Sequence, residues 1–160
     1  MKRYRFKKID AFAVAGSSGN PAGYVRLSPG GEEITDRDMQ QIARELKGFV
    51  SETGFLREGT PGECDLSIRY FSCEREVEFC GHATIAIMDD VVRSDDRFRN
   101  RESLRLRTNR GVVTVLNRTG EDGMVYIRLP NRSSPTHAPR SERPPPRSHL
   151  TSGISIPRYP

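Results

Sequence analysis

Cys80 and His82 lie in a Cys-Gly-His-Ala-Thr segment, residues 80–84, that joins an alternating stretch to an apolar one. The alternation predicts an extended lead-in, and the apolar run predicts a buried helix. A strand that turns through Gly81 into a helix leaves the first N–H groups of that helix without main-chain partners. Together with the helix dipole, these groups attract an anion. The segment therefore predicts an anion site with a thiol and an imidazole beside it.

The chemistry of Cys80 has two interpretations. At the start of a helix the pKa of its thiol can be lowered, which would make it a base or a nucleophile. A buried cysteine with only a packing role is equally ordinary. Helical spacing places His82 on a different face of the first turn, so we do not expect this pair to bind a metal ion together. A Cys–His catalytic dyad is also not expected, because such partners normally come from separate elements.

Glu52 is the acidic residue with the most unusual surroundings. Val50, Phe55 and Leu56 flank it, so its carboxylate is expected to lose part of its contact with water. Such a carboxylate is suited to exchanging a proton near neutral pH. The alternative is an outward-facing polar residue on an amphipathic strand, and the pattern alone favours this alternative.

Two helices and seven strands are expected to position these residues. The first helix, 36–47, begins with a capping box formed by Thr35 and Asp38, and Gly48 marks its end. The second, 81–92, is too long for a typical buried strand, although it is rich in β-branched residues. Strands are predicted near 9–13, 22–27, 51–56, 65–72, 104–108, 112–116 and 124–129, with a brief extension at 76–79 and a charged loop at 93–102. The order predicts an α+β domain with a curved sheet around the second helix.

The overall composition is that of one ordinary domain. The chain has 160 residues, 34% of them hydrophobic, which is enough to form a core. No apolar run suggests a membrane span, and the basic N-terminus lacks the apolar region of a signal peptide, so a cytoplasmic protein is the default expectation. The three cysteines lack the spacing of a disulfide framework or a zinc ribbon.

The net charge of +5 is concentrated near the C-terminus. Residues 131–160 contain five Arg and one Glu, which leaves a net charge of only +1 on residues 1–130. We therefore do not expect a nucleic-acid surface on the folded domain.

A change of composition predicts a domain at 1–132 and a tail rich in Pro, Arg and Ser at 133–160. Eight of the eleven prolines lie in residues 130–160, and the hydrophobic periodicity ends there, which is typical of disorder. Residues 143–147 resemble a polyproline ligand of an SH3-like domain, but the composition favours a solvated tail.

Six short motifs occur in a characteristic order. They are residues 9–13, 19–22, 39–45, 51–56, 69–71 and 76–84. In this order they resemble PhzF-like proteins, the phenazine-biosynthesis-like family of the diaminopimelate-epimerase fold, over about residues 4–130. The resemblance implies one copy of the usual two domains, each a curved mixed sheet wrapped around a central helix. It also implies an isomerase or epimerase that moves a proton on a small carboxylic acid, with neither metal nor organic cofactor.

The resemblance implies catalytic roles for three residues. Glu52 would be the acid/base that shuttles the proton. His82 would bind the substrate and relay the proton. Cys80 stands at the position of a catalytic thiol in the epimerase relatives, although the phenazine enzyme itself has no cysteine there.

Four further residues would bind the substrate if the resemblance holds. Gly81 and Ala83, together with His82, would donate backbone hydrogen bonds to a substrate carboxylate. Thr84 follows them in the same segment. Asn20 would line the cleft.

The sequence also departs from the family. Family members continue into a second domain that supplies the opposite wall of the cleft and a further acidic group, for which this chain shows no counterpart. Asp89 and Asp90 are polar where an apolar central helix is expected. These departures suggest a truncated or frame-shifted product, which as an inactive half-enzyme would be a remnant or a binding or assembly module. A homodimer would instead close the cleft, and a weaker hypothesis gives the tail a nucleic-acid or SH3-like partner.

Overall fold

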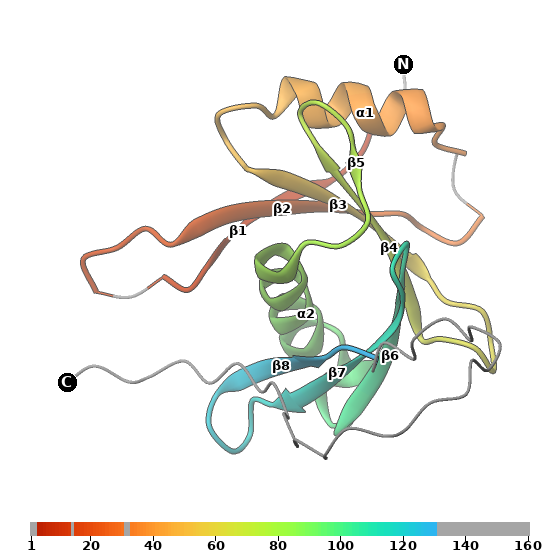
Figure 1. The fold of residues 1–160 in the computed structure, drawn as a ribbon. Coiled ribbons are helices and arrows are strands. Elements are labelled where there is room, and N and C mark those ends of the chain that lie inside the picture. Colours follow the sequence, from red (N-terminus) through yellow and green to blue (C-terminus); the bar gives the residue numbers. More distant parts are fainter. Residues whose placement is uncertain (1–2, 14, 31–32, 131–160) are drawn as a thin grey trace, which may run out of the picture.

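Eight strands and three helices form the described part of the chain in a computed structural model, which covers residues 3–13, 15–30 and 33–130 (Figure 1). The strands are β1 (Phe6–Ala11), β2 (Asn20–Arg26), β3 (Glu52–Glu58), β4 (Leu66–Ser72), β5 (Glu76–Val77), β6 (Ser103–Thr108), β7 (Gly111–Arg118) and β8 (Met124–Arg128). The helices are α1 (Asp36–Glu45), α2 (Gly81–Ser94) and α3 (Asp96–Arg99). The predicted tail, with residues 143–147, lies outside the described residues.

The strands form one mixed sheet in the order β1-β2-β3-β4-β6-β7-β8, with β5 paired to β4. Neighbours are antiparallel except β2 with β3 and β4 with β6, which are parallel. The sheet curls around α2 (Figure 1). The helix contacts β1 and β2 at one edge of the sheet and β7 and β8 at the other edge. The predicted α+β fold, a curved mixed sheet around a central helix, is confirmed.

Helix α2 forms the centre of the main core. Its buried residues are Ala83, Thr84, Ala86, Ile87, Met88, Val91 and Val92. Each β-branched residue lowers helix propensity by less than about 0.7 kcal/mol, whereas burying an aliphatic side chain stabilises by about 1.5–3 kcal/mol. Packing therefore outweighs propensity, and the segment is helical, as its length predicted.

Gly54 lets this helix approach the backbone of β3. A Cβ atom at this position would lie 2.7 Å from Cδ1 of Ile87 and 2.9 Å from Cδ1 of Ile68. Carbon atoms in favourable contact are about 3.5–4.0 Å apart, so an added methyl group would have to displace both side chains. The close approach brings α2 onto β3 near the residue that begins the strand, Glu52.

Helix α1 packs on the outer face of the sheet (Figure 1). The predicted capping box is present, because the backbone N–H of Asp38 donates to Thr35 Oγ1 and the backbone N–H of Thr35 donates to Asp38 Oδ2, each at 3.1 Å. The helix ends at Glu45, with Leu46 as its C-cap. This end lies two positions before the predicted one.

The acidic pair in α2 lies within the helix. Asp90 accepts hydrogen bonds from the Tyr24 hydroxyl at 2.8 Å and from the Lys7 ammonium group. Asp89 pairs with Arg93 one turn later. The helix continues past both residues because these partners from β1, β2 and its own next turn compensate the two carboxylates.

The predicted charged loop at 93–102 contains the short helix α3. Asp95 caps it by accepting a hydrogen bond from the backbone N–H of Arg97, and Phe98 is buried. The many charges in this segment concealed the single apolar residue that anchors it. In the described part of the chain, no helix combines the length and apolar character that crossing a membrane requires.

Candidate active site

The first residue of β3 and the first turn of α2 meet at the edge of the main core. Glu52 pairs with Ala22 of the parallel strand β2 and with Ser72 of the antiparallel strand β4. This register holds its carboxylate beside His82, with Glu52 Oε2 and His82 Nε2 3.2 Å apart. The two side chains are 22% and 17% exposed, so they face each other in a partly dehydrated environment.

Both of these atoms are buried, and within the described residues neither has a hydrogen-bond partner. Their separation of 3.2 Å is short enough for an ion pair, but the relative orientation does not satisfy hydrogen-bond geometry. A buried polar atom without a partner costs about 1–3 kcal/mol. Glu52 and His82 therefore have unused capacity to hold a proton or a polar ligand.

Cys80 completes a group of three. Its Sγ atom lies 3.3 Å from Nδ1 of His82. The prediction that the two side chains point to different faces is wrong, because Cys80 is the N-cap of α2 and has an extended backbone, with φ −131° and ψ 108°. Helical spacing does not apply at an N-cap, so the thiol can turn back to the imidazole.

Of the two interpretations of Cys80, its surroundings favour the buried thiol over the acidic one. Burial raises the pKa of the Cys80 thiol to about 11, and the nearby Glu52 carboxylate raises it further. The backbone N–H groups of Ala83 and His82 at the helix start lower this pKa, but the effect of burial is larger. At neutral pH Cys80 is therefore a protonated thiol.

The remaining residues of the segment differ in exposure. Gly81 is exposed, whereas Ala83 is fully buried. Thr84 is also fully buried, and its hydroxyl donates to the Cys80 carbonyl oxygen at 2.6 Å and bonds to the Tyr70 hydroxyl at 2.6 Å. The side chain of Thr84 thus lies beneath the three close residues rather than among them.

Tyr70 is a supporting residue that the sequence analysis did not single out. It is fully buried in β4, on the face predicted from the alternation of residues 65–72. Burial raises the pKa of its hydroxyl above the ordinary value. A hydroxyl on the buried face of an amphipathic strand is a signal that could have identified it, because such a group needs an internal partner.

Asn20 lies at the start of β2, on the exposed side of this region. The Ser51 hydroxyl donates to its Oδ1 atom at 3.2 Å, and the backbone N–H of Ser51 donates to the Pro21 carbonyl at 3.0 Å. Asn20 is therefore tied to the residue that precedes Glu52. It is not drawn into the group of three.

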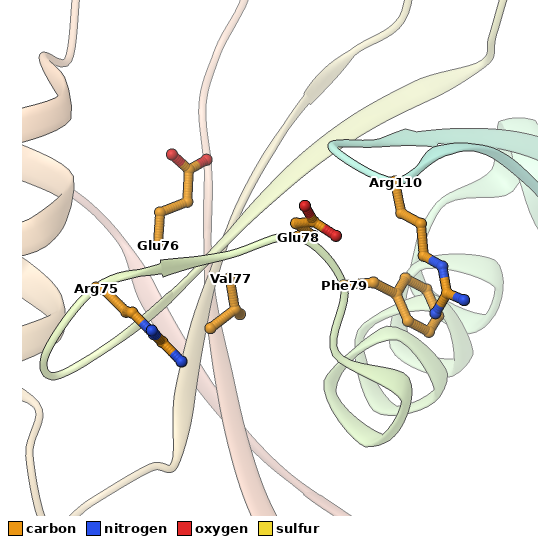
Figure 2. Close-up of a pocket in the computed structure, with 6 residues that line it drawn as sticks. All are labelled: Arg75, Glu76, Val77, Glu78, Phe79 and Arg110. Atoms are coloured by element: carbon orange, nitrogen blue, oxygen red, sulfur yellow. The ribbon is translucent and has the colours of Figure 1, made fainter.

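A hollow of about 360 Å³ lies along residues 75–79, the segment that leads from β5 into α2. It is lined by Arg75, Glu76, Val77, Glu78, Phe79 and Arg110 (Figure 2). In Figure 2, Glu76 points to the side of the strand opposite Arg75 and Val77. The carboxylate of Glu76 is bound by Arg69 at 2.6 and 2.7 Å and by Asn109 at 2.6 Å. The hollow is therefore largely polar, and Glu52, Cys80 and His82 do not line it.

A family model described as phenazine biosynthesis-like protein matches residues 9–149 of the chain. The uncharacterized isomerase YfhB of Bacillus subtilis is 33% identical over 139 residues, which are 87% of this chain and 44% of that protein.

Solved structures of similar fold include members of the same family. The phenazine biosynthesis protein of the PhzF family from Bacillus anthracis matches with a TM-score of 0.65 and 29% identity, over 79% of this chain and 40% of that one. A hydroxyproline epimerase from Agrobacterium vitis matches with a TM-score of 0.55 and 11% identity, over 78% of this chain and 40% of that one, and so shares the fold. The chain spans less than half the length of these proteins. It belongs to the phenazine biosynthesis-like family of PhzF proteins.

Proposed function

We propose that this domain forms one wall of an isomerase or epimerase site that transfers a proton on a small carboxylic acid. The observation that carries the proposal is the approach of the Glu52 carboxylate to the His82 imidazole at 3.2 Å. A carboxylate and an imidazole in a partly dehydrated site are suited to general acid–base catalysis, which contributes about 10²–10⁴-fold to a rate.

The substrate carboxylate would bind at the start of α2. The N–H groups of Gly81, His82 and Ala83 lie in the first turn of a helix whose N-cap side chain makes no capping hydrogen bond. Such a turn attracts an anion through its N–H groups and through the helix dipole. The carbon next to the bound carboxylate would then face Glu52.

Glu52 would remove the proton from that carbon, and the electron pair of the broken C–H bond would delocalise onto the adjacent substrate carboxylate, which the N–H groups at the start of α2 bind. A proton delivered to another position, or to the opposite face of the same carbon, completes an isomerisation or an epimerisation. His82 would relay the proton through its contact with Glu52. Cys80 would contribute as a thiol that holds its proton at neutral pH, as an acid rather than a base.

A non-catalytic binding or assembly module is the second candidate. The chain spans 44% of YfhB and 40% of the two solved structures, and in this candidate the domain acts by itself. An opposite wall would have to come from groups beyond the described residues or from a second copy of the chain. In this alternative the start of α2 would bind a carboxylate without catalysing its reaction.

Proton exchange with solvent tests the proposal. The purified chain is incubated in D₂O with both enantiomers of several amino acids and with cyclohexadiene carboxylic acids, and NMR follows deuterium incorporation. Incorporation at a carbon near the carboxylate is expected. Binding of a carboxylate without exchange would support the module instead. Light scattering on the same sample tells whether any activity belongs to a monomer or a dimer.

A further inference from the structure

We infer that Glu52, Cys80 and His82 form a binding site for a thiophilic divalent cation such as Zn²⁺. One donor atom from each side chain, a carboxylate oxygen, a sulfur and a ring nitrogen, lies within 4.8 Å of the other two. The three residues come from two elements that are separate in sequence, β3 and the start of α2. The grouping is therefore a product of the fold and not of a local motif.

The distances suit a tetrahedral ion after a small adjustment. Metal–ligand bonds of 2.0–2.3 Å place tetrahedral ligands about 3.3–3.6 Å apart. Glu52 Oε2 lies 3.2 Å from Nε2 of His82, and Cys80 Sγ lies 3.3 Å from Nδ1, the other ring nitrogen. With one nitrogen counted, the three donor atoms lie within 4.8 Å of one another. An ion takes only one ring nitrogen, so the imidazole has to turn or one of the other side chains has to shift. Three protein ligands leave a fourth position open, as in catalytic zinc sites.

Two of the donors lack other partners. Glu52 Oε2 and His82 Nε2 are buried atoms without a hydrogen bond in the described part of the chain. A cation bound between them would compensate this dehydration, and the thiol would lose its proton on coordination. The side chains of Glu52 and His82 remain 22% and 17% exposed, which leaves a route for an ion from solvent.

The ligand set predicts which ions bind. Sulfur and imidazole donors favour Zn²⁺ and Co²⁺, whereas Mg²⁺ prefers oxygen ligands in octahedral geometry. An ion in this position would occupy the atoms that the proposed acid–base chemistry uses, and so would inhibit it. That consequence rests on the proposed function, whereas the binding itself rests only on the geometry of the three donors.

Cobalt absorption provides the test. Co²⁺ is added to the reduced full chain in the absence of substrate, and the absorption of a tetrahedral ion with a thiolate ligand is recorded. We expect one equivalent to bind, Zn²⁺ to displace it, and Mg²⁺ to leave it in place. Cys80→Ser should abolish the thiolate charge-transfer band. Glu52→Gln and His82→Gln should each weaken Zn²⁺ binding by at least about tenfold, since even supporting residues of metal sites contribute this much.

The controls replace the more exposed of the two other thiols and both of the other imidazoles. Cys73→Ser and the double variant His137→Gln/His149→Gln should bind Co²⁺ as the unmodified chain does. A Co²⁺ spectrum without thiolate character, or one that survives Cys80→Ser, would overturn the inference. A Zn²⁺-dependent rise in the thermal midpoint, present in the unmodified chain and lost in Glu52→Gln, provides a second readout if Cys80→Ser does not fold. None of these results depends on whether the chain exchanges protons with a substrate.

Discussion

Glu52 Oε2 and His82 Nε2 lie 3.2 Å apart, buried and outside hydrogen-bond geometry. The strand pairing β2–β3 and the packing of α2 on β3 bring them together. Neither atom takes part in a hydrogen bond of the described part of the chain, so the pair is free to act on a bound molecule.

Glu52→Gln should reduce proton exchange by at least about 100-fold, because an amide cannot accept the substrate proton. The substitution preserves the shape of the side chain, so the unfolding midpoint should change little. Glu74→Gln, in the exposed turn between β4 and β5, is the matched control and should keep full activity. Equal exchange rates in the two variants would remove Glu52 from the proposed mechanism.

Cys80 should react slowly with iodoacetamide near neutral pH and faster as the pH approaches 11, since burial raises the pKa of its thiol to about 11. Mass spectrometry of labelled peptides measures the rate at each cysteine. Cys73, which is partly exposed, serves as the internal comparison. Rapid labelling of Cys80 at pH 7 would contradict the raised pKa.

The same shift makes the stability of the domain depend on pH. The folded protein favours the neutral thiol, because its pKa in the fold exceeds the ordinary value of 9.0. The contribution of the Cys80 thiol to the free energy of unfolding is therefore fully present below about pH 9 and is lost as the pH rises toward 11. Urea unfolding of the unmodified chain and of Cys80→Ser at a series of pH values should show this loss only in the former. Parallel curves for the two proteins would rule out the linkage.

Thr84→Val should destabilise the domain by about 1–3 kcal/mol, because it leaves the buried Tyr70 hydroxyl without its partner. The double variant Thr84→Val/Tyr70→Phe removes both hydroxyls and should lose less than the sum of the two single variants. Denaturant titrations measure all three. Additive losses would show that the 2.6 Å contact contributes nothing to stability.

Gly54→Ala should destabilise the domain by about 1–3 kcal/mol, because its new methyl group would overlap Cδ1 of Ile87. Ile87→Val removes that Cδ1 atom and alone costs about 0.5–1.5 kcal/mol. Combined with Gly54→Ala, it should restore part of the lost stability. If the double variant loses as much stability as the two single variants together, the new methyl group overlaps another side chain, with Ile68 as the next candidate.

Much of the fold could be predicted from local patterns. The Thr35–Asp38 capping box and the alternation of residues 65–72 were sufficient for α1 and β4, and the length of the apolar segment was sufficient for α2. Helix α3 escaped prediction because one buried aromatic residue anchors it within a charged stretch. The order of the predicted elements indicated the curved sheet around the second helix, and the family resemblance implied the same architecture.

The candidate site was harder to predict, because its geometry is not local. Whether Glu52 faces solvent or His82 is set by a parallel pairing with β2 and by the packing of α2. The contact between Cys80 and His82 depends on the backbone of a single N-cap residue, which helical spacing does not describe. Motif resemblance pointed to three residues that the structure brings together, whereas periodicity predicted the wrong relation between Cys80 and His82.

The N-cap of α2 leaves the start of the central helix without a side-chain cap. Ser, Thr, Asp or Asn at an N-cap typically stabilises a helix by about 1 kcal/mol, and Cys80 makes no such hydrogen bond. Beside it lie Glu52 Oε2 and His82 Nε2, two buried atoms without a hydrogen bond among the described residues. This end of the central helix is thus a point of local frustration. Amide hydrogen exchange should begin there, at the first turn of α2, before it reaches the buried turns that follow.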